Sequence, residues 1–208
     1  MRRSRTVIAV FLLVVSIAAG VPAGAARPPD PRERLIEHLQ KTRELFLDSV
    51  DGLTEEQWNY RTAPDRWSIA EIAEHITITE TFLRDTVVRI LDQPAPTGIA
   101  DGTFRREDEV MKLIIDRSER FDAPPELWPT NQWKTPNETL AEFRRQRDET
   151  LKLARAQNDL RMHGADHPIV GPLDAYGWLV FLSGHTERHT LQIREVMDDP
   201  RFPRPASP

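Results

Sequence analysis

The stretch Leu173–Val196, LDAYGWLVFLSGHTERHTLQIREV, decides the fold. Its apolar residues recur with the period of an α-helix. One line along this helix carries Trp178, Leu182, His185, His189 and Gln192. Because residues four apart on a helix lie one above the other, His185 and His189 present two imidazoles to a single point. The segment therefore predicts a helix that carries two candidate metal ligands.

Three other segments show the helical period, and they run from Pro31 to Val50, from Ser68 to Leu91 and from Thr135 to Ala156. Ser68 is followed three residues later by Glu71, and Thr135 by Glu138, and both pairs are capping boxes that mark a helix start. Gly52 follows the first segment and ends it. Together with the last helix, these segments predict an all-α fold, most simply a four-helix bundle with one long crossover.

The crossover between the second and third of these helices is rich in helix-breaking residues. A short helix is expected within Phe104–Ile115, followed by a proline-rich loop over Phe121–Pro136 that contains Trp128 and Trp133. A loop of this length inside a compact domain is often functional. It forms either a lid over a site or a hydrophobic flap that closes one end of the core.

A third histidine, His75, falls at the edge of the apolar stripe of the second helix and so points toward the interior. A buried neutral imidazole is costly unless its nitrogens find partners, and a metal ion satisfies several imidazoles at once. Two histidines from one helix and one from another are enough protein ligands for a catalytic divalent metal. The alternative is three histidines that are buried for structural reasons alone.

The residues around the histidine pair exclude some of the better-known metalloprotease patterns. Glu187 occupies the third place of His-Thr-Glu-Arg-His, which matches neither the zincin nor the inverzincin motif, and it points about 200° away from the first histidine. Gln192 shares the ligand face, where it either bonds to a ligand or bound water or caps the buried stripe. Arg188 is expected to support the site or to lie on the surface. Glu71, one turn before the upstream histidine, is the nearest carboxylate by helical geometry.

The other histidines are expected outside the metal site. His38 lies beside the stripe of the first helix and has no partner at ligand spacing. His163 and His167 are separated by a glycine and followed by a proline, so their spacing is not helical. We expect both to be loop residues, with a place at the site entrance as the alternative.

Residues 1–25 have the pattern of a secretory signal peptide. Three arginines precede the apolar run Val7–Ala19, and Ala23-Gly24-Ala25 offers a small-residue cleavage site. The run has about 13 residues, fewer than the ~20 needed to span a bilayer. We therefore expect cleavage and export to the periplasm or the extracellular space, without a stable membrane anchor; a retained anchor is the alternative.

Charge and composition limit the function of the remaining chain. The leader holds three of the 28 Lys and Arg residues and no acid, so its removal leaves 25 against 33 Asp and Glu, a formal charge of −8. An acidic surface argues against nucleic-acid partners. The absence of cysteine excludes disulfides and thiolate ligands, so burial of one core over residues 31–197 must supply the stability. The proline-rich residues 198–208 are expected to form an unstructured tail.

With these residues in place, the chain resembles the DinB/YfiT-like superfamily over about Pro31 to Met197. The motifs that carry the resemblance are Trp67-Ser68-Ile69 leading to Glu74-His75-Ile76, His167-Pro168-x-x-Gly171-Pro172-Leu173 and Gly184-His185-x-x-Arg188-His189-x-x-Gln192-Ile193. The resemblance implies an up-down-down-up-like four-helix bundle, often a homodimer. It also implies a divalent metal, typically zinc or nickel, held by His75, His185 and His189.

The resemblance implies two kinds of chemistry for a small-molecule substrate. Some relatives are thiol S-transferases, in which the metal lowers the pKa of a thiol, and others are described as hydrolases. An oxidising compartment outside the cytoplasm is unfavourable for a thiol-dependent enzyme. We therefore expect a metal-dependent enzyme of the hydrolase type. A thiol S-transferase and a non-catalytic metal- or ligand-binding bundle are the alternatives.

Overall fold

The computed structural model describes residues 30–95, 103–118 and 121–204, so the expected leader over residues 1–25 lies outside the described residues. In chain order the elements are α1 (Pro31–Val50), α2 (Glu55–Trp58), α3 (Ile69–Leu91), α4 (Glu107–Ile115), the 3-10 turn η1 (Pro125–Leu127), α5 (Pro136–Ala156), β1 (Gly164–His167), β2 (Gly171–Asp174) and α6 (Ala175–Met197). No helix within these three ranges combines the length and apolarity needed to cross a bilayer.

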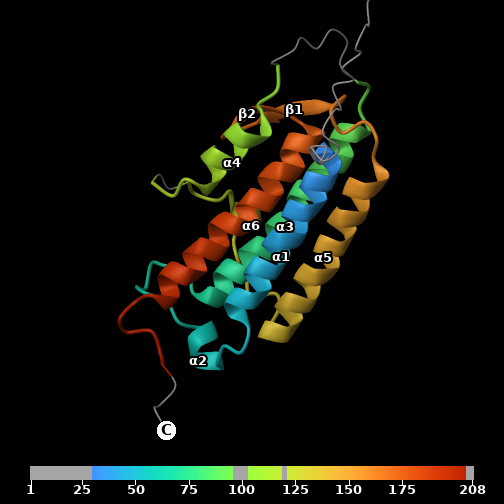
Figure 1. Ribbon diagram of the computed structural model, residues 1–208. Helices are drawn as coiled ribbons and strands as arrows, with labels where there is room; N and C mark the ends of the chain where they lie inside the picture. Colours follow the sequence, from blue (N-terminus) through green and yellow to red (C-terminus); the bar gives the residue numbers. More distant parts are fainter. Residues whose placement is uncertain (1–29, 96–102, 119–120, 205–208) are drawn as a thin grey trace, which may run out of the picture.

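The long helices α1, α3, α5 and α6 form a four-helix bundle (Figure 1). Both α5 and α6 pack against α1 and α3, so α1 and α3 occupy opposite corners. Figure 1 shows α1 and α6 running in one direction and α3 and α5 in the other. The connection from α3 to α5 therefore returns along the whole bundle, and its helix α4 packs against α6. This architecture confirms the predicted all-α bundle with one long crossover.

The helix boundaries follow from local capping. Ser68 and Glu71 form a capping box at α3, in which the Ser68 amide donates to the Glu71 carboxylate over 2.6 Å. Thr135 and Glu138 do the same at α5, where Pro136 holds the first helical position. These caps satisfy amide groups that have no partner inside the helix. The predicted starts of both helices are confirmed.

The structure contains a short antiparallel hairpin that the sequence pattern did not predict. Strand β1 pairs with β2 from Gly164 opposite Asp174 to His167 opposite Gly171. Asp174 then caps α6 by accepting from the Gly177 amide over 2.6 Å, so this helix begins at Ala175 and not at Leu173. Strands of four residues are too short to show a period-2 pattern, and their pairing depends on contacts beyond either segment.

The expectation of an unstructured tail is wrong for residues 198–204. Phe202 is 8% exposed and packs edge-on against Tyr60, with ring centroids 5.4 Å apart. The Gln57 side chain donates to the Pro203 carbonyl over 2.8 Å. One buried aromatic side chain and these bonds outweigh the local effect of the prolines. Residues 205–208 lie outside the described residues.

A layer of polar side chains lies between two apolar parts of the bundle core. Its centre is Arg147 on α5, whose guanidinium forms a two-point ion pair with Glu80 on α3 at 2.8 and 2.9 Å. The remaining guanidinium hydrogens bond to the Leu39 carbonyl and to the hydroxyls of Thr42 and Thr186. This Arg147–Glu80 network joins all four long helices.

Candidate metal centre

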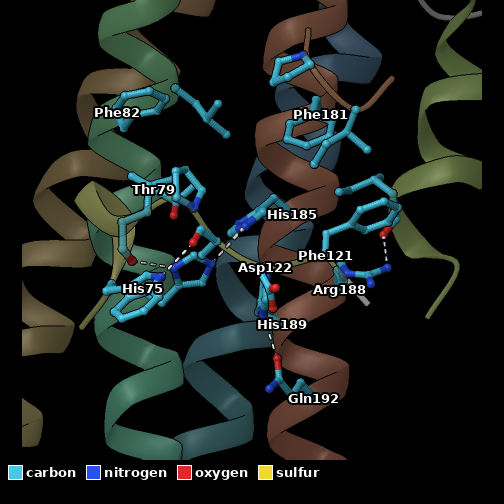
Figure 2. Close-up of a pocket in the computed structure, with 18 of the residues that line it drawn as sticks. His75, Thr79, Phe82, Phe121, Asp122, Phe181, His185, Arg188, His189 and Gln192 are labelled. Carbon is cyan, nitrogen blue, oxygen red and sulfur yellow. Dashed lines mark hydrogen bonds between the residues drawn. The ribbon is translucent and has the colours of Figure 1, made fainter. Parts of the chain in front are cut away.

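The bundle brings together the three histidines that the sequence singled out. His75 lies on α3, and His185 and His189 lie one turn apart on α6 (Figure 2). One nitrogen of each ring lies within 4.8 Å of a nitrogen of both others, and Nε2 of His75 is 3.2 Å from Nε2 of His185. Two imidazole nitrogens bound to one tetrahedral zinc lie about 3.3 Å apart, given Zn–N bonds of roughly 2.0–2.1 Å. The spacing fits a shared metal ion.

Hydrogen bonds fix the orientation of two of the rings. Nδ1 of His75 lies 2.9 Å from the Leu127 carbonyl of η1, which only accepts hydrogen bonds, so this nitrogen carries the proton. Nδ1 of His189 lies 2.8 Å from Oε1 of Gln192, one turn further along α6. Each ring therefore turns an unprotonated Nε2 toward the cluster. Ligands of catalytic metals are commonly oriented in this way by a carbonyl or amide partner.

The surroundings keep all three rings neutral, which is the form that binds a metal. Burial lowers the pKa of His75, and the Leu127 carbonyl only partly opposes this effect. Burial lowers the pKa of His185 well below its usual value, and the neighbouring His189 and His75 lower it further. The pKa of His189 is lowered well below its usual value by burial and by His75. Three neutral nitrogens facing one point are a suitable donor set for a cation.

Glu74 positions the loop that supports His75. Its buried carboxylate accepts hydrogen bonds from the backbone amides of Thr130, Asn131 and Gln132 at 2.9 to 3.0 Å. This holds the segment after η1 against α3, close to the carbonyl that orients His75. The sequence pattern did not predict this role for Glu74. The available signal was a carboxylate directly before the histidine on the same helix.

The other residues considered for the site take different places. Arg188 is 8% exposed and lines the cavity, and it donates to the carbonyls of Ile114 and Asp116, so it also ties α6 to the end of α4. Glu71 does not line the cavity described below; its carboxylate caps α3 and pairs with Arg61 at 3.1 Å. Gln192 lines the cavity and orients His189, as stated above.

The remaining histidines lie apart from the cluster. His38 pairs with Glu187 at 3.5 Å. His163 bonds to the Gln93 carbonyl and to Asp159. His167, at the end of β1, lines the cavity, and Nδ1 of its ring accepts from the Ile169 amide at 3.2 Å. We expected His163 and His167 to be loop residues or to lie at the entrance of the site. Of these two histidines, only His167 lines the cavity.

The histidines open into a cavity of about 990 Å³. Its lining residues on α3 and α6 face each other. Residues of the crossover between 121 and 128, the turn over 167–169 and residues 65–67 also contribute to its wall. Phe121, Leu127 and Trp128 belong to this wall, whereas Trp133 does not line the cavity. The crossover loop therefore covers the site, which favours a functional loop over a flap that only closes the core.

Comparisons with known proteins agree with this fold. The chain is 23% identical over 153 residues to the Bacillus subtilis protein YuaE, whose function is not characterised; the match covers 73% of this chain and 90% of that protein. The fold of the present chain is similar to that of Bacillus subtilis YfiT, which is described as a probable metal-dependent hydrolase with an unusual four-helix bundle topology. That similarity has a TM-score of 0.56 at 15% identity and covers 85% of this chain and 94% of YfiT. The family model of the DinB superfamily matches residues 38–193. The chain therefore belongs to the DinB superfamily.

Proposed function

We propose that this protein is a metal-dependent hydrolase of small molecules that binds zinc or nickel through Nε2 of His75, His185 and His189. The observation that carries the proposal is the convergence of three neutral imidazole nitrogens at the wall of a large cavity. Imidazole ligands suit both metals. The description of YfiT as a probable metal-dependent hydrolase supports the same reaction class.

Each residue of the site has a defined part in this proposal. His185 and His189 supply two ligands from adjacent turns of one helix, and His75 supplies the third across the α3–α6 interface. The Leu127 carbonyl and the Gln192 amide keep two of the rings turned toward the metal. The cavity binds the substrate beside the histidines. A bound divalent ion acts as a Lewis acid and makes a nucleophile available near neutral pH.

Metal analysis and turnover test the proposal together. The protein is purified without a metal-affinity tag, its metal content is measured, and its hydrolysis of ester and amide substrates is followed with and without chelator. We expect close to one equivalent of metal and turnover that chelator removes. His185→Ala should lose both, because it removes one of the three ligands. His163→Ala is the matched control, since this histidine bonds outside the cluster, and it should keep both.

The alternatives give different results in the same experiment. Less than half an equivalent of metal, unchanged by His185→Ala, contradicts a metal site at these histidines. Full metal content without turnover of any substrate class indicates a non-catalytic binding bundle. Chelator-sensitive conjugation of a thiol, without hydrolysis, indicates a thiol S-transferase.

A further inference from the structure

The cavity extends from the histidines along the facing sides of α3 and α6. On α3 it is lined by Thr79, Phe82, Leu83 and Thr86, which share one face of the helix. On α6, Trp178 and Phe181 lie opposite, before His185 in the sequence. Figure 2 shows Phe82 and Phe181 at the same end of the cavity, away from His75 and His189. We call the part lined by Thr79, Phe82, Leu83, Thr86, Trp178 and Phe181 the apolar arm. Beyond it the cavity is also lined by Arg89, whose guanidinium donates to the Thr86 hydroxyl over 2.7 Å. Thr86 lies eleven positions after His75 on α3, so the arm reaches about 16 Å from the histidines at roughly 1.5 Å per residue.

Exposed apolar side chains gather around this cavity. Seven large hydrophobic residues are exposed among the described residues, and four of them line it: Phe82 at 37%, Phe121 at 50%, Trp128 at 53% and Ile169 at 49%. Exposed apolar side chains that occur singly need no explanation, whereas a cluster around a concave site indicates a ligand with apolar surface. The arm and its rim therefore suit a ligand with a long or aromatic apolar group.

One buried hydroxyl at the cavity has no hydrogen-bond partner within the described residues. Thr79 is 2% exposed, and its Oγ1 is the one buried side-chain nitrogen or oxygen of the described residues that lacks a hydrogen-bond partner. On the same helix, Thr77 and Thr86 both donate to the carbonyl four residues earlier at 2.9 Å. Thr79 lines the cavity one turn after His75 and one turn before Leu83. A buried hydroxyl left without a partner is costly, so its position favours a ligand that bonds to it.

We propose that the substrates are esters or amides whose linear or aryl apolar group fills the apolar arm. The carbonyl group lies at the histidines, and a polar atom next to it bonds to the Thr79 hydroxyl. Hydrolysis breaks the bond between the acyl carbon and its oxygen or nitrogen and adds the elements of water, which gives a carboxylic acid and an alcohol or amine. This substrate class rests on the proposed function, and its ligand preference is measurable without turnover.

Binding of two hydroxamates tests the arm separately from catalysis. Acetohydroxamate and octanohydroxamate share one head group and differ only in the length of their alkyl chain. Their dissociation constants are measured by calorimetry with zinc-loaded and with chelator-treated protein. We expect octanohydroxamate to bind at least tenfold more tightly in both forms, because added methylene groups bury apolar surface in the arm. Equal affinities for the two compounds overturn the proposal.

Matched substitutions test where the alkyl chain of octanohydroxamate lies within the cavity. Phe82→Ser should weaken binding of octanohydroxamate more than threefold and leave acetohydroxamate unchanged. Val88→Ser is the control, because Val88 lies on the same helix, is 39% exposed and does not line the cavity. Thr79→Val keeps the side-chain shape and should weaken both compounds about equally, whereas Thr79→Ser should retain their affinity. If Phe82→Ser and Val88→Ser change the affinity for octanohydroxamate equally, the alkyl chain does not lie against Phe82.

Turnover separates failure of the substrate class from failure of the proposed function. Equal kcat/KM for p-nitrophenyl acetate and p-nitrophenyl octanoate would leave hydrolysis standing and remove the apolar substrate class. Chain-dependent binding of the hydroxamates without hydrolysis of either ester would leave the arm as a ligand site and remove the hydrolase. Preference for the octanoate in both binding and kcat/KM is the expected result.

Discussion

The bundle holds two groups of buried polar side chains, the Arg147–Glu80 network and the three-histidine cluster, and they differ in what satisfies them. All five N–H groups of Arg147 have acceptors within the protein. The cluster instead turns the Nε2 atoms of neutral rings toward one another, at a cavity. The first group is complete as folded, and the second has the form of a site that a ligand completes.

The difference lies in the charges and in the positions of the two groups. Arg147 and Glu80 have opposite charges and lie in the centre of the bundle, where hydroxyls from the surrounding helices complete their bonds. The histidines offer the same kind of donor atom three times, at the side of the bundle where the crossover loop forms a cavity. Three like donors that face one another favour a cation, whereas the opposite charges of the ion pair satisfy each other.

The largest expected change in stability comes from removing Arg147 from the Arg147–Glu80 network. Arg147→Met leaves the Glu80 carboxylate buried without its partner, and we expect a loss of about 3–5 kcal/mol in the free energy of unfolding. Urea denaturation measures it. Arg145→Met is the matched control on the same helix, because Arg145 is exposed and pairs with Glu142; it should leave the free energy of unfolding nearly unchanged. Similar losses for the two variants would contradict the special role of the network.

Adding a metal to the three-histidine cluster should increase the stability of the protein. Zinc at 100 times its dissociation constant should raise the free energy of unfolding of metal-free protein by about 2.7 kcal/mol, because it binds the folded state. His75→Ala should remove this gain. Magnesium at the same concentration is the control and should give no gain, since it prefers oxygen ligands. Equal stabilisation by the two ions would indicate binding away from the histidines.

A smaller effect is expected from pH. Burial lowers the pKa of His167 to about 4 from 6.5, so the unfolded chain binds more protons than the folded protein between these values. The stability of metal-free protein should therefore fall as pH decreases from 6.5 toward 4 and level off above 6.5. His75, His185 and His189, whose pKa values are also lowered, change stability in the same direction.

Urea unfolding of metal-free protein at pH 7.5, 6 and 5 measures this dependence. His167→Gln retains a side-chain oxygen that accepts from the Ile169 amide but has no group that titrates in this range. The variant should lose less stability between pH 7.5 and pH 5 than the wild type. An identical loss in both proteins would show that His167 does not contribute.

Much of the helical framework follows from short-range signals. Ser68 with Glu71 and Thr135 with Glu138 mark helix starts because their bonds lie within one turn. The pairing of His185 with His189 also follows from helix geometry alone. By contrast, the β1–β2 hairpin and the packing of Phe202 on Tyr60 depend on contacts between segments, and local preference predicted neither of them.

The sequence by itself determined the four long helices, the single crossover and the three candidate ligands, because capping and helical periodicity act within a few residues. Only the tertiary structure decided that His75 meets the other two rings, that the Leu127 carbonyl orients it and that Glu74 holds the loop in place. It also decided that Arg147 is satisfied and Thr79 is not. Whether a polar group is satisfied depends on which helices are neighbours, and that is set by packing of the whole bundle and not by any one segment.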